Sequence, residues 1–391
     1  MKTISESTFD AGRRQFGKGL LGAGATLAAP ALLAQAKPAE LKFACIVPLT
    51  GQASSFGIRN RDGATVAVEH FNSRELVIGD KTYSVRLDVS DMANDARQAI
   101  TLMRQAASDP SYASILCLTS SVAFVGGVPV AAQLKMPVIG AGSAAPVKQW
   151  NPYMYRVNPV SELATPLMIK KVVAKEKIKR LAVIYDQMQD AQVGDAELVK
   201  KTAADGGYEI VEFQAFRTGD QDFSPQLATI RAAKPDGIFL GAGVAEGVRI
   251  LAQMRGVGIN APVMTGFGTF LETAYWDGTS GGTKGGYTWI THDLMAPQGE
   301  LKAFFEAYNK RFKLEATSFS AYGYDAVAVA VEALRRAGAV DREKMREVLA
   351  SLEMTTPLGT RIKFQNPPSG NNLVPTMIVT RITGRGTYEV I

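Results

Sequence analysis

Histidine is scarce in this chain of 391 residues, which contains only His70 and His292. A catalytic nucleophile needs a base within hydrogen-bond reach, and histidine is the usual one. His70 stands beside Glu69 in a helical pattern, where a structural role is the commoner one, and His292 stands in the segment WITHDL. No His-Glu-x-x-His motif for zinc is present. We therefore predict that the chain is not an enzyme and holds no metal ion.

Complete nucleotide-binding motifs are lacking as well. The segment GAGVAEG, Gly241–Gly247, follows a strand pattern and opens a helical one, as a dinucleotide-binding turn does. Such a site also needs an acidic residue at the end of the next strand to bind the ribose. The next strand, APVMTGFG, has no acidic residue before Glu272, and no Gly-x-x-x-x-Gly-Lys-Ser/Thr loop exists. We expect no cofactor.

The chain also lacks a basic stripe. Its net charge is +6, and its lysines and arginines are scattered among acidic residues. Nucleic-acid-binding proteins gather basic residues on one face, often with aromatic residues between them. The sequence therefore predicts no nucleic-acid partner.

Cysteine occurs only at Cys45 and Cys117, each inside an apolar run that is typical of a buried strand. The two residues lack the Cys-x-x-Cys spacing of redox and zinc sites. They permit one disulfide in an oxidising compartment, whereas two buried free thiols are commoner at such positions. The sequence leaves this choice open.

The first 36 residues differ in character from the rest. They combine the pair Arg13 and Arg14 with the apolar run GLLGAGATLAAPALLA and the small residues Ala34–Ala36. This is the pattern of an export signal, which we predict for residues 1–36, with cleavage at its end. The paired arginines favour the twin-arginine route, although two flanking glycines leave general secretion open. No other run of about 18 apolar residues follows, so we expect a soluble protein in the periplasm.

From Leu41 onward the chain alternates strand-like and helix-like runs. One series covers residues 41–143, and a second of similar length covers residues 180–268. Strands at this spacing imply right-handed β-α-β crossovers and parallel sheets. We therefore predict an α/β fold with two Rossmann-like lobes.

Two long amphipathic helical patterns follow, at residues 299–312 and 321–338, without strands of their own. They pack most simply on the first lobe, which requires the chain to cross between the lobes more than once. The alternating tail from Gly359 to Ile391 predicts antiparallel strands. The predicted lobes are residues 38–158 plus 293–354, and residues 159–292 plus 355–391.

Polar turns follow three strands of the first lobe, at Leu49–Gly57, Leu118–Phe124 and Gly140–Pro146. In parallel sheets, ligands bind beyond the carboxyl ends of the strands. Ser120 and Ser121 stand at the N-cap of the next helix, where their hydroxyls and the following N–H groups can donate to an anion. The same serines also suit simple helix capping, which is worth about 1 kcal/mol and needs no ligand.

Three stretches resemble, in order and spacing, the periplasmic branched-chain amino-acid-binding proteins of ABC importers. The matching stretches are LKFACIVPLTGQASSFGIRNRDGATVAVEHFN, LCLTSSVAFVGGVPVAAQLKMPVIGAGSAAP and GDQDFSPQLATIRAAKPDGIFLGAG. The resemblance runs from about Leu41 to the C-terminus. It implies a type I periplasmic binding fold, with two lobes joined by three hinge crossovers. It also implies that the lobes close on a small solute, which is then delivered to a membrane permease.

In that family the serine pair and the glycine-rich turn bind the carboxylate of the ligand. The matching positions here are Ser120, Ser121, Ser143 and Ala144. Phe56 matches an aromatic residue that lines the side-chain pocket. Ala144 stands where the amino-acid binders commonly have a threonine, and Ser143 beside it can supply a hydroxyl.

The second lobe departs further from the family pattern. Gln192 and Val193 stand near the place of a usual tyrosine, and we expect Gln192 to be a polar contact. Phe267 stands where the amino-acid binders tend to have an acid that pairs with the ligand's ammonium group. Burying an ammonium group without a carboxylate is costly. We therefore predict a small carboxylate ligand without an obligatory α-ammonium, such as an aromatic or aliphatic acid, with Phe267 as a stacking surface.

Two other functions stay open at this point. One is a ligand sensor of the same fold that presents its closed form to a membrane receptor. The other is a secreted enzyme that uses the glycine-rich turns for a cofactor. The scarcity of histidine and the missing ribose acid count against the enzyme.

Overall fold

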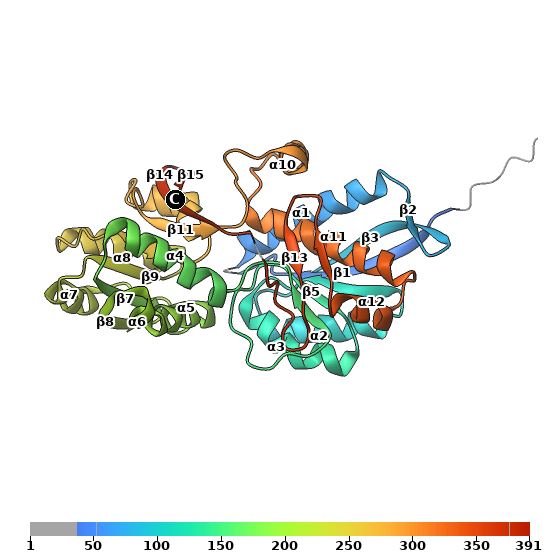
Figure 1. Ribbon diagram of the computed structural model, residues 1–391, viewed down its shortest axis with the longest axis horizontal. Helices are drawn as coiled ribbons and strands as arrows, with labels where there is room; N and C mark the ends of the chain where they lie inside the picture. The colour runs from blue at the N-terminus through green and yellow to red at the C-terminus, as the bar shows by residue number, and fades with distance from the viewer. Residues whose placement is uncertain (1–36, 52, 375) are drawn as a thin grey trace, which may run out of the picture. The chain divides into compact units, whose positions relative to one another are not determined.

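The computed structural model describes residues 37–51, 53–374 and 376–391. The predicted export signal at residues 1–36 lies outside these residues. Residues 38–391 form one compact unit with two large sheets (Figure 1). Each sheet has hydrophobic cores of its own.

The first sheet has six strands in the order β2-β3-β1-β4-β5-β6. All neighbouring strands are parallel except β2 and β3. Parallel strands need crossover connections, and three helices provide them. The strands are β1 (Ala39–Val47), β2 (Leu76–Ile78), β3 (Lys81–Asp91), β4 (Tyr112–Cys117), β5 (Val138–Gly140) and β6 (Met154–Arg156). The helices are α1 (Ser54–Asn72), α2 (Ala96–Ser108) and α3 (Ser121–Leu134).

Strand β1 shows why this sheet is buried on both faces. Its apolar run supplies Phe43 and Cys45 to the core on one face and Ala44 and Ile46 to the core on the other. Side chains along a strand alternate between faces, so a continuous apolar run serves both cores. Helices α2 and α3 cover one face, and α1 covers the other together with α11 (Ser318–Ala337).

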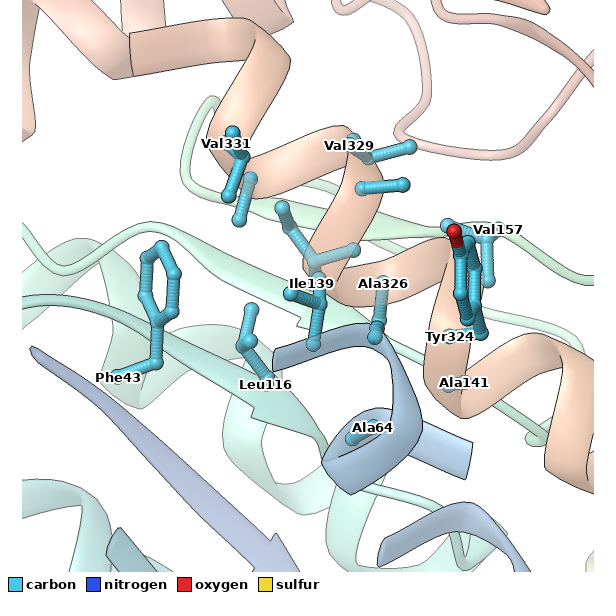
Figure 2. Packing of buried hydrophobic residues seen from close by; sticks show 14 of the residues in the cluster. Phe43, Ala64, Leu116, Ile139, Ala141, Val157, Tyr324, Ala326, Val329 and Val331 are labelled. Carbon is cyan, nitrogen blue, oxygen red and sulfur yellow. The ribbon is translucent and has the colours of Figure 1, made fainter. Parts of the chain in front are cut away.

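Helices α1 and α11 come from opposite ends of the chain and lie side by side, blue and orange in Figure 1. Figure 2 shows how Ala64 of α1 and Ala326 of α11 meet the strand residues Leu116 and Ile139 in one core. The two helix backbones approach closely: a Cβ atom at Gly323 would lie 1.9 Å from the Asn60 carbonyl oxygen. Small residues at this contact therefore set the position of α11.

The second sheet has seven strands in the order β15-β14-β11-β10-β9-β7-β8. Five strands are parallel, and β14 and β15 are added in antiparallel orientation by the end of the chain. The strands are β7 (Arg180–Asp186), β8 (Glu209–Phe216), β9 (Gly237–Gly241), β10 (Val263–Thr265), β11 (Tyr287–Ile290), β14 (Ile378–Gly384) and β15 (Thr387–Val390). The helices around it are α4 (Ser161–Glu176), α5 (Asp190–Lys201), α6 (Ala203–Gly206), α7 (Ser224–Ala233), α8 (Val244–Gly256), η1 (Thr269–Leu271) and α9 (Thr273–Gly278).

The chain passes between the two lobes three times. The first passage follows β6, the second follows β11, and the third lies between Asn372 and Ile378. The elements between the second and third passages pack on the first core. These are α10 (Gly299–Phe312), α11, α12 (Arg342–Leu349), β12 (Glu353–Thr355) and β13 (Arg361–Lys363).

The third passage occurs later in the chain than the boundary after residue 354 that we predicted from the sequence. Ile362 and Phe364 are buried in the first core, and the Asn372 side chain donates to the Val157 carbonyl over 3.1 Å. Ile362 and Phe364, which follow β12, thus belong to the first lobe. The last two strands, from Ile378 onward, belong to the second lobe.

Both cysteines are buried free thiols. Cys45 lies in β1, and its register partner on the neighbouring strand β4 is Leu116, the residue before Cys117. The neighbouring thiol of Cys45 and burial raise the pKa of Cys117 well above its ordinary value. A raised pKa makes the Cys117 thiol a poor nucleophile. The complete burial of both residues indicates a packing role for each of them.

Replacing Gly323 by alanine is expected to destabilise the protein by about 3 kcal/mol, because the added methyl group overlaps the α1 backbone. Replacing Gly256, in the last turn of α8, by alanine is the matched control. Its Cβ would meet nothing within 4 Å, so stability stays unchanged or rises by up to about 1 kcal/mol. Urea unfolding measures both values, and equal stabilities of the two variants would contradict the role of the α1–α11 contact.

Candidate ligand-binding site

The turn after β4 exposes donor groups at the start of α3. Cys117 ends the strand with a φ of 76°, which turns the chain out of the sheet. Ser120 is the N-cap residue of α3, yet its side chain makes no capping hydrogen bond. Its Oγ is buried and has no partner among the described residues. Simple capping therefore does not account for Ser120, whose hydroxyl remains available to another group.

The turn after β5 lies directly beside the first one. The Ser143 hydroxyl donates to the Ser121 Oγ over 3.2 Å and so joins the two turns. Gly142 has a φ of 138°, and a Cβ atom there would lie 2.9 Å from Thr119 and 3.0 Å from the Phe319 ring. Only glycine fits this position, because both the backbone angle and the available space exclude a side chain.

Two polar side chains, those of Asn158 and Arg156, hold the second turn from behind. The Gly142 N–H donates to Asn158 Oδ1 over 2.7 Å, and Asn158 Nδ2 donates to the Ser143 carbonyl over 2.9 Å. Arg156 donates to the Ser143 and Ala145 carbonyls over 2.9 and 2.7 Å, and to Asn371 Oδ1 over 2.8 Å. These bonds fix the carbonyl side of the turn.

A cluster of aromatic rings stands next to these turns and draws on both lobes. The Phe56 ring of α1 lies 4.6 Å from Phe319, and the Phe267 ring, which follows β10, lies 5.1 Å from the same ring. Phe267 also lies 5.5 Å from Tyr322 and 4.7 Å from Trp289. Phe319 thus contacts both Phe56 of the first lobe and Phe267 of the second, the two aromatic residues that we predicted from the sequence.

The first turns of α5 bring second-lobe polar groups toward the same turns. A Cβ atom at Gly194 would be 2.9 Å from Pro146, so α5 approaches the 140–146 turn closely. Gln192, two residues earlier, has a buried Oε1 without a hydrogen-bond partner among the described residues. Burial raises the pKa of Asp195 to about 6, although hydrogen bonds from Thr165 and a nearby serine oppose the shift.

Most of the residues named from the sequence gather here. Ser120, Ser121 and Ser143 form the two joined turns, which we call the head-group cradle, together with Ala144. The Ala144 carbonyl accepts from the Ser161 N–H over 3.3 Å, which ties the cradle to the start of α4. No hydrogen bond links Gln192 to the serines in the described residues. The roles of all these residues as ligand contacts stay predictions.

The sequence reasoning missed Phe319, Tyr322 and Arg156. Phe319 and Tyr322 stand three positions apart at the start of α11, a helix that is otherwise rich in alanine and valine. Residues three positions apart lie on the same face of a helix, so this spacing could have indicated that the two rings act together. Arg156 stands in the polar stretch between the two strand series, where no motif marks it.

The two histidines have structural partners. His70 Nδ1 lies 2.9 Å from the Tyr324 hydroxyl. His292 is buried on the second passage, 2.8 Å from Thr291 Oγ1 and 2.9 Å from Thr360 Oγ1, and its Nε2 is 3.8 Å from the Asp325 carboxylate. Burial lowers the pKa of His292 to about 4 and raises that of Asp325 to about 7.

In the described part of the chain, no group of three or more His, Cys, Asp or Glu residues is placed to hold a metal ion. Nor does any helix there combine the length and the apolar character needed to span a membrane.

Two sheets with separate cores, three passages between them and polar turns at the ends of parallel strands define the type I periplasmic binding fold. The chain belongs to the periplasmic binding protein family, whose model matches residues 40–387. It is similar to a leucine-, isoleucine-, valine-, threonine- and alanine-binding protein of Pseudomonas aeruginosa, with 25% identity over 323 residues, 82% of this chain and 84% of the relative.

Two solved structures extend the likeness. A leucine-binding protein from Thermotoga maritima matches with a TM-score of 0.78 and 25% identity, over 90% of this chain and 97% of the other. A solute-binding protein of an ABC transporter from Rhodopseudomonas palustris, solved with 3,4-dihydroxybenzoic acid, matches with a TM-score of 0.76 and 21% identity, over 90% and 96% of the two chains. The resemblance and the fold class read from the sequence are confirmed.

The buried pair His292 and Asp325 predicts two opposite pH dependences of stability. Between pH 4 and 6.5 the unfolded chain binds a proton at His292 that the folded chain does not, so this group makes stability rise with pH. Asp325, whose ordinary pKa is 3.8, keeps its proton in the folded chain up to about pH 7, so it makes stability fall as the pH rises from about 4 to 7. In the native protein the two slopes offset each other.

In the Asp325→Asn variant, the slope due to His292 should therefore be the only one of the two that remains. Its stability, relative to the native protein, should fall from pH 7 to pH 4 by up to about 1.4 kcal/mol per pH unit. His292→Asn should instead lose stability, relative to the native protein, as the pH rises from 4 to 6.5. Urea unfolding at several pH values measures both, and parallel profiles for the two variants would contradict the assignment.

Proposed function

We propose that this protein captures a small organic acid between its two lobes, as the periplasmic substrate-binding protein of an ABC importer, and delivers it to a membrane permease. The family supports a binding role in the periplasm. The Rhodopseudomonas palustris structure with 3,4-dihydroxybenzoic acid supports the transporter and the ligand class. The export signal predicted for residues 1–36 agrees with this location.

The buried hydroxyl of Ser120 carries the proposal. A buried hydroxyl without a hydrogen-bond partner is unfavourable, so such a group in a folded protein points to a partner that arrives later. Ser120 lies at the amino end of α3, where the helix dipole favours an anion. The Ser121 hydroxyl, which accepts from Ser143, provides a further donor beside it. A carboxylate matches this set of donors.

The aromatic cluster supports an apolar or aromatic body for the ligand. Phe56, Phe267 and Phe319 present ring faces and edges from both lobes. Aromatic rings gain from offset and edge-on contacts with one another, so a benzoate-type ring suits this wall. Phe267 also takes the place at which the resembled amino-acid binders have an acid.

A branched-chain amino acid is the second candidate ligand, because two acceptors near the cradle lack partners in the described residues. These are the Glu162 Oε2 and Gln192 Oε1 atoms. They suit an ammonium group, but also the hydroxyl of a phenolic acid. The Pseudomonas aeruginosa relative, named for leucine, isoleucine, valine, threonine and alanine, supports the amino-acid alternative.

Calorimetric titration of the purified protein separates these ligands. The probes are 4-hydroxybenzoate, 4-methylpentanoate and leucine, of which the second is leucine without its amine. We expect one of the two acids to bind with a Kd in the micromolar range or below, which is roughly 8 kcal/mol or more of binding free energy. Leucine binding far more tightly than both acids would favour the second candidate instead, and binding of none would overturn the proposal.

Ser120→Ala is expected to weaken binding of the acid roughly tenfold or more, because it removes one charge-assisted hydrogen bond. Its effect on the stability of the free protein should be small, since the hydroxyl has no partner there. Ser114→Ala is the matched control in β4. Its Oγ donates to the Pro137 carbonyl over 2.9 Å, so it should lose stability by about 1 kcal/mol and keep its affinity. Titration and urea unfolding of both variants check this; the reverse pattern would contradict it.

A further inference from the structure

Arg156 carries a buried positive charge without a hydrogen-bonded carboxylate. Its side chain is fully buried, and its bonds go to two backbone carbonyls and one amide oxygen, all of them neutral. Its remaining nitrogen, Nη2, has no partner in the part of the chain that the structure describes. The guanidinium also faces the rings of Phe124 and Trp150, with 5.3 and 5.4 Å to their centroids.

A buried charge of this kind needs compensation. Taking an ion out of water is costly unless an opposite charge or several hydrogen bonds replace the lost solvation. Burial lowers the pKa of Arg156 to about 10, so the group stays charged at neutral pH. Glu162 opposes this shift, but the two side chains share no hydrogen bond, and each has an unpartnered terminal atom among the described residues.

The position of Arg156 indicates where a compensating anion would bind. Nη1 of Arg156 bonds the Ser143 carbonyl, and that carbonyl shares one peptide unit with the Ala144 N–H. In a trans peptide the C=O and N–H groups point in opposite directions. The Ala144 N–H therefore points away from Arg156, and no hydrogen bond of this N–H occurs within the described residues. A guanidinium on the carbonyl side also polarises the peptide and strengthens its N–H as a donor.

We propose that Arg156 is the positioning residue of the head-group cradle: it holds the Ser143–Ala145 turn and supplies the positive charge that makes the cradle prefer an anionic head group to a neutral one of the same shape. This inference rests on the proposed function, since it assumes that the cradle receives the ligand's head group. The charge acts through the peptide unit, without contact between Arg156 and the ligand.

The experiment compares an acid with its amide. The pairs are 4-hydroxybenzoate with 4-hydroxybenzamide, 4-methylpentanoate with 4-methylpentanamide, and leucine with leucinamide. They are titrated by calorimetry, with the amides taken to millimolar concentration. Acid and amide have nearly the same shape, so the ratio of their Kd values reports on charge. A residue that only shaped the turn would affect both members of a pair alike.

Three variants change the charge in different ways. Arg156→Met removes it and is expected to reduce the preference for the acid about 10- to 50-fold. Arg156→Lys keeps the charge but loses part of the carbonyl contacts, so both affinities fall while the preference is largely retained. Asn371→Asp places a carboxylate on the oxygen that Arg156 already bonds over 2.8 Å, and should reduce the preference several-fold without removing any hydrogen bond of the side chain.

Arg342→Met is the matched control. Arg342 also donates to three backbone carbonyls of the first lobe, those of Ala107, Asp109 and Tyr112. These precede or begin β4, whereas the cradle follows the end of that strand. Its loss should lower the thermal stability and leave the preference for the acid unchanged.

The outcomes separate this inference from the proposed function. A reduced preference in Arg156→Met and Asn371→Asp, with retention in Arg156→Lys and Arg342→Met, supports the charge role. If Arg156→Met does not fold, Asn371→Asp alone decides. Acid binding by the native protein with unchanged preference in these variants overturns this inference and leaves the proposed function in place. Binding of no member of the three pairs by the native protein overturns both.

Discussion

The close contact between α1 and α11 is the constraint on which the rest of the arrangement depends. Without side chains at Gly63 and Gly323, the two helices approach to backbone distance, and α11 takes its place on the first sheet. Because α11 belongs to the late part of the chain, this contact obliges the chain to return from the second lobe and to leave again. The same contact brings Phe319 beside Phe56 at the cradle end of α1.

Strand-like apolar runs alternate with helix-like runs along the chain, and this pattern was enough to predict both parallel sheets. Buried parallel strands are apolar on both faces and therefore appear as continuous apolar runs. The pattern does not say which core receives a short apolar strand late in the chain. Residues 361–364 and residues 378–382 are both short runs that mix apolar and polar residues, yet the first set packs on the first core and the second set extends the second sheet. That choice depends on long-range contacts such as the one between Asn372 and Val157.

The candidate site was partly readable for a similar reason. Ser120, Ser121 and Ser143 follow strands directly, so the rule for parallel sheets placed them together. Phe319 and Tyr322 approach only through the helix contact, and Arg156 acts from behind a turn. Neither relation leaves a local pattern, because each joins residues that are distant in the chain or separated by a peptide unit.

The bonds around Arg156 also bear on how the lobes can move. The Arg156 N–H donates to the Gly370 carbonyl over 3.0 Å, its side chain bonds Asn371, and Asn372 bonds the Val157 carbonyl. The first and third connections between the lobes are thus fastened together at their first-lobe ends. Any rotation of the lobes must therefore bend the few residues beyond these bonds, and the two connections must bend together. Arg156 also bonds the Ser143 carbonyl, so this shared hinge is tied directly to the head-group cradle.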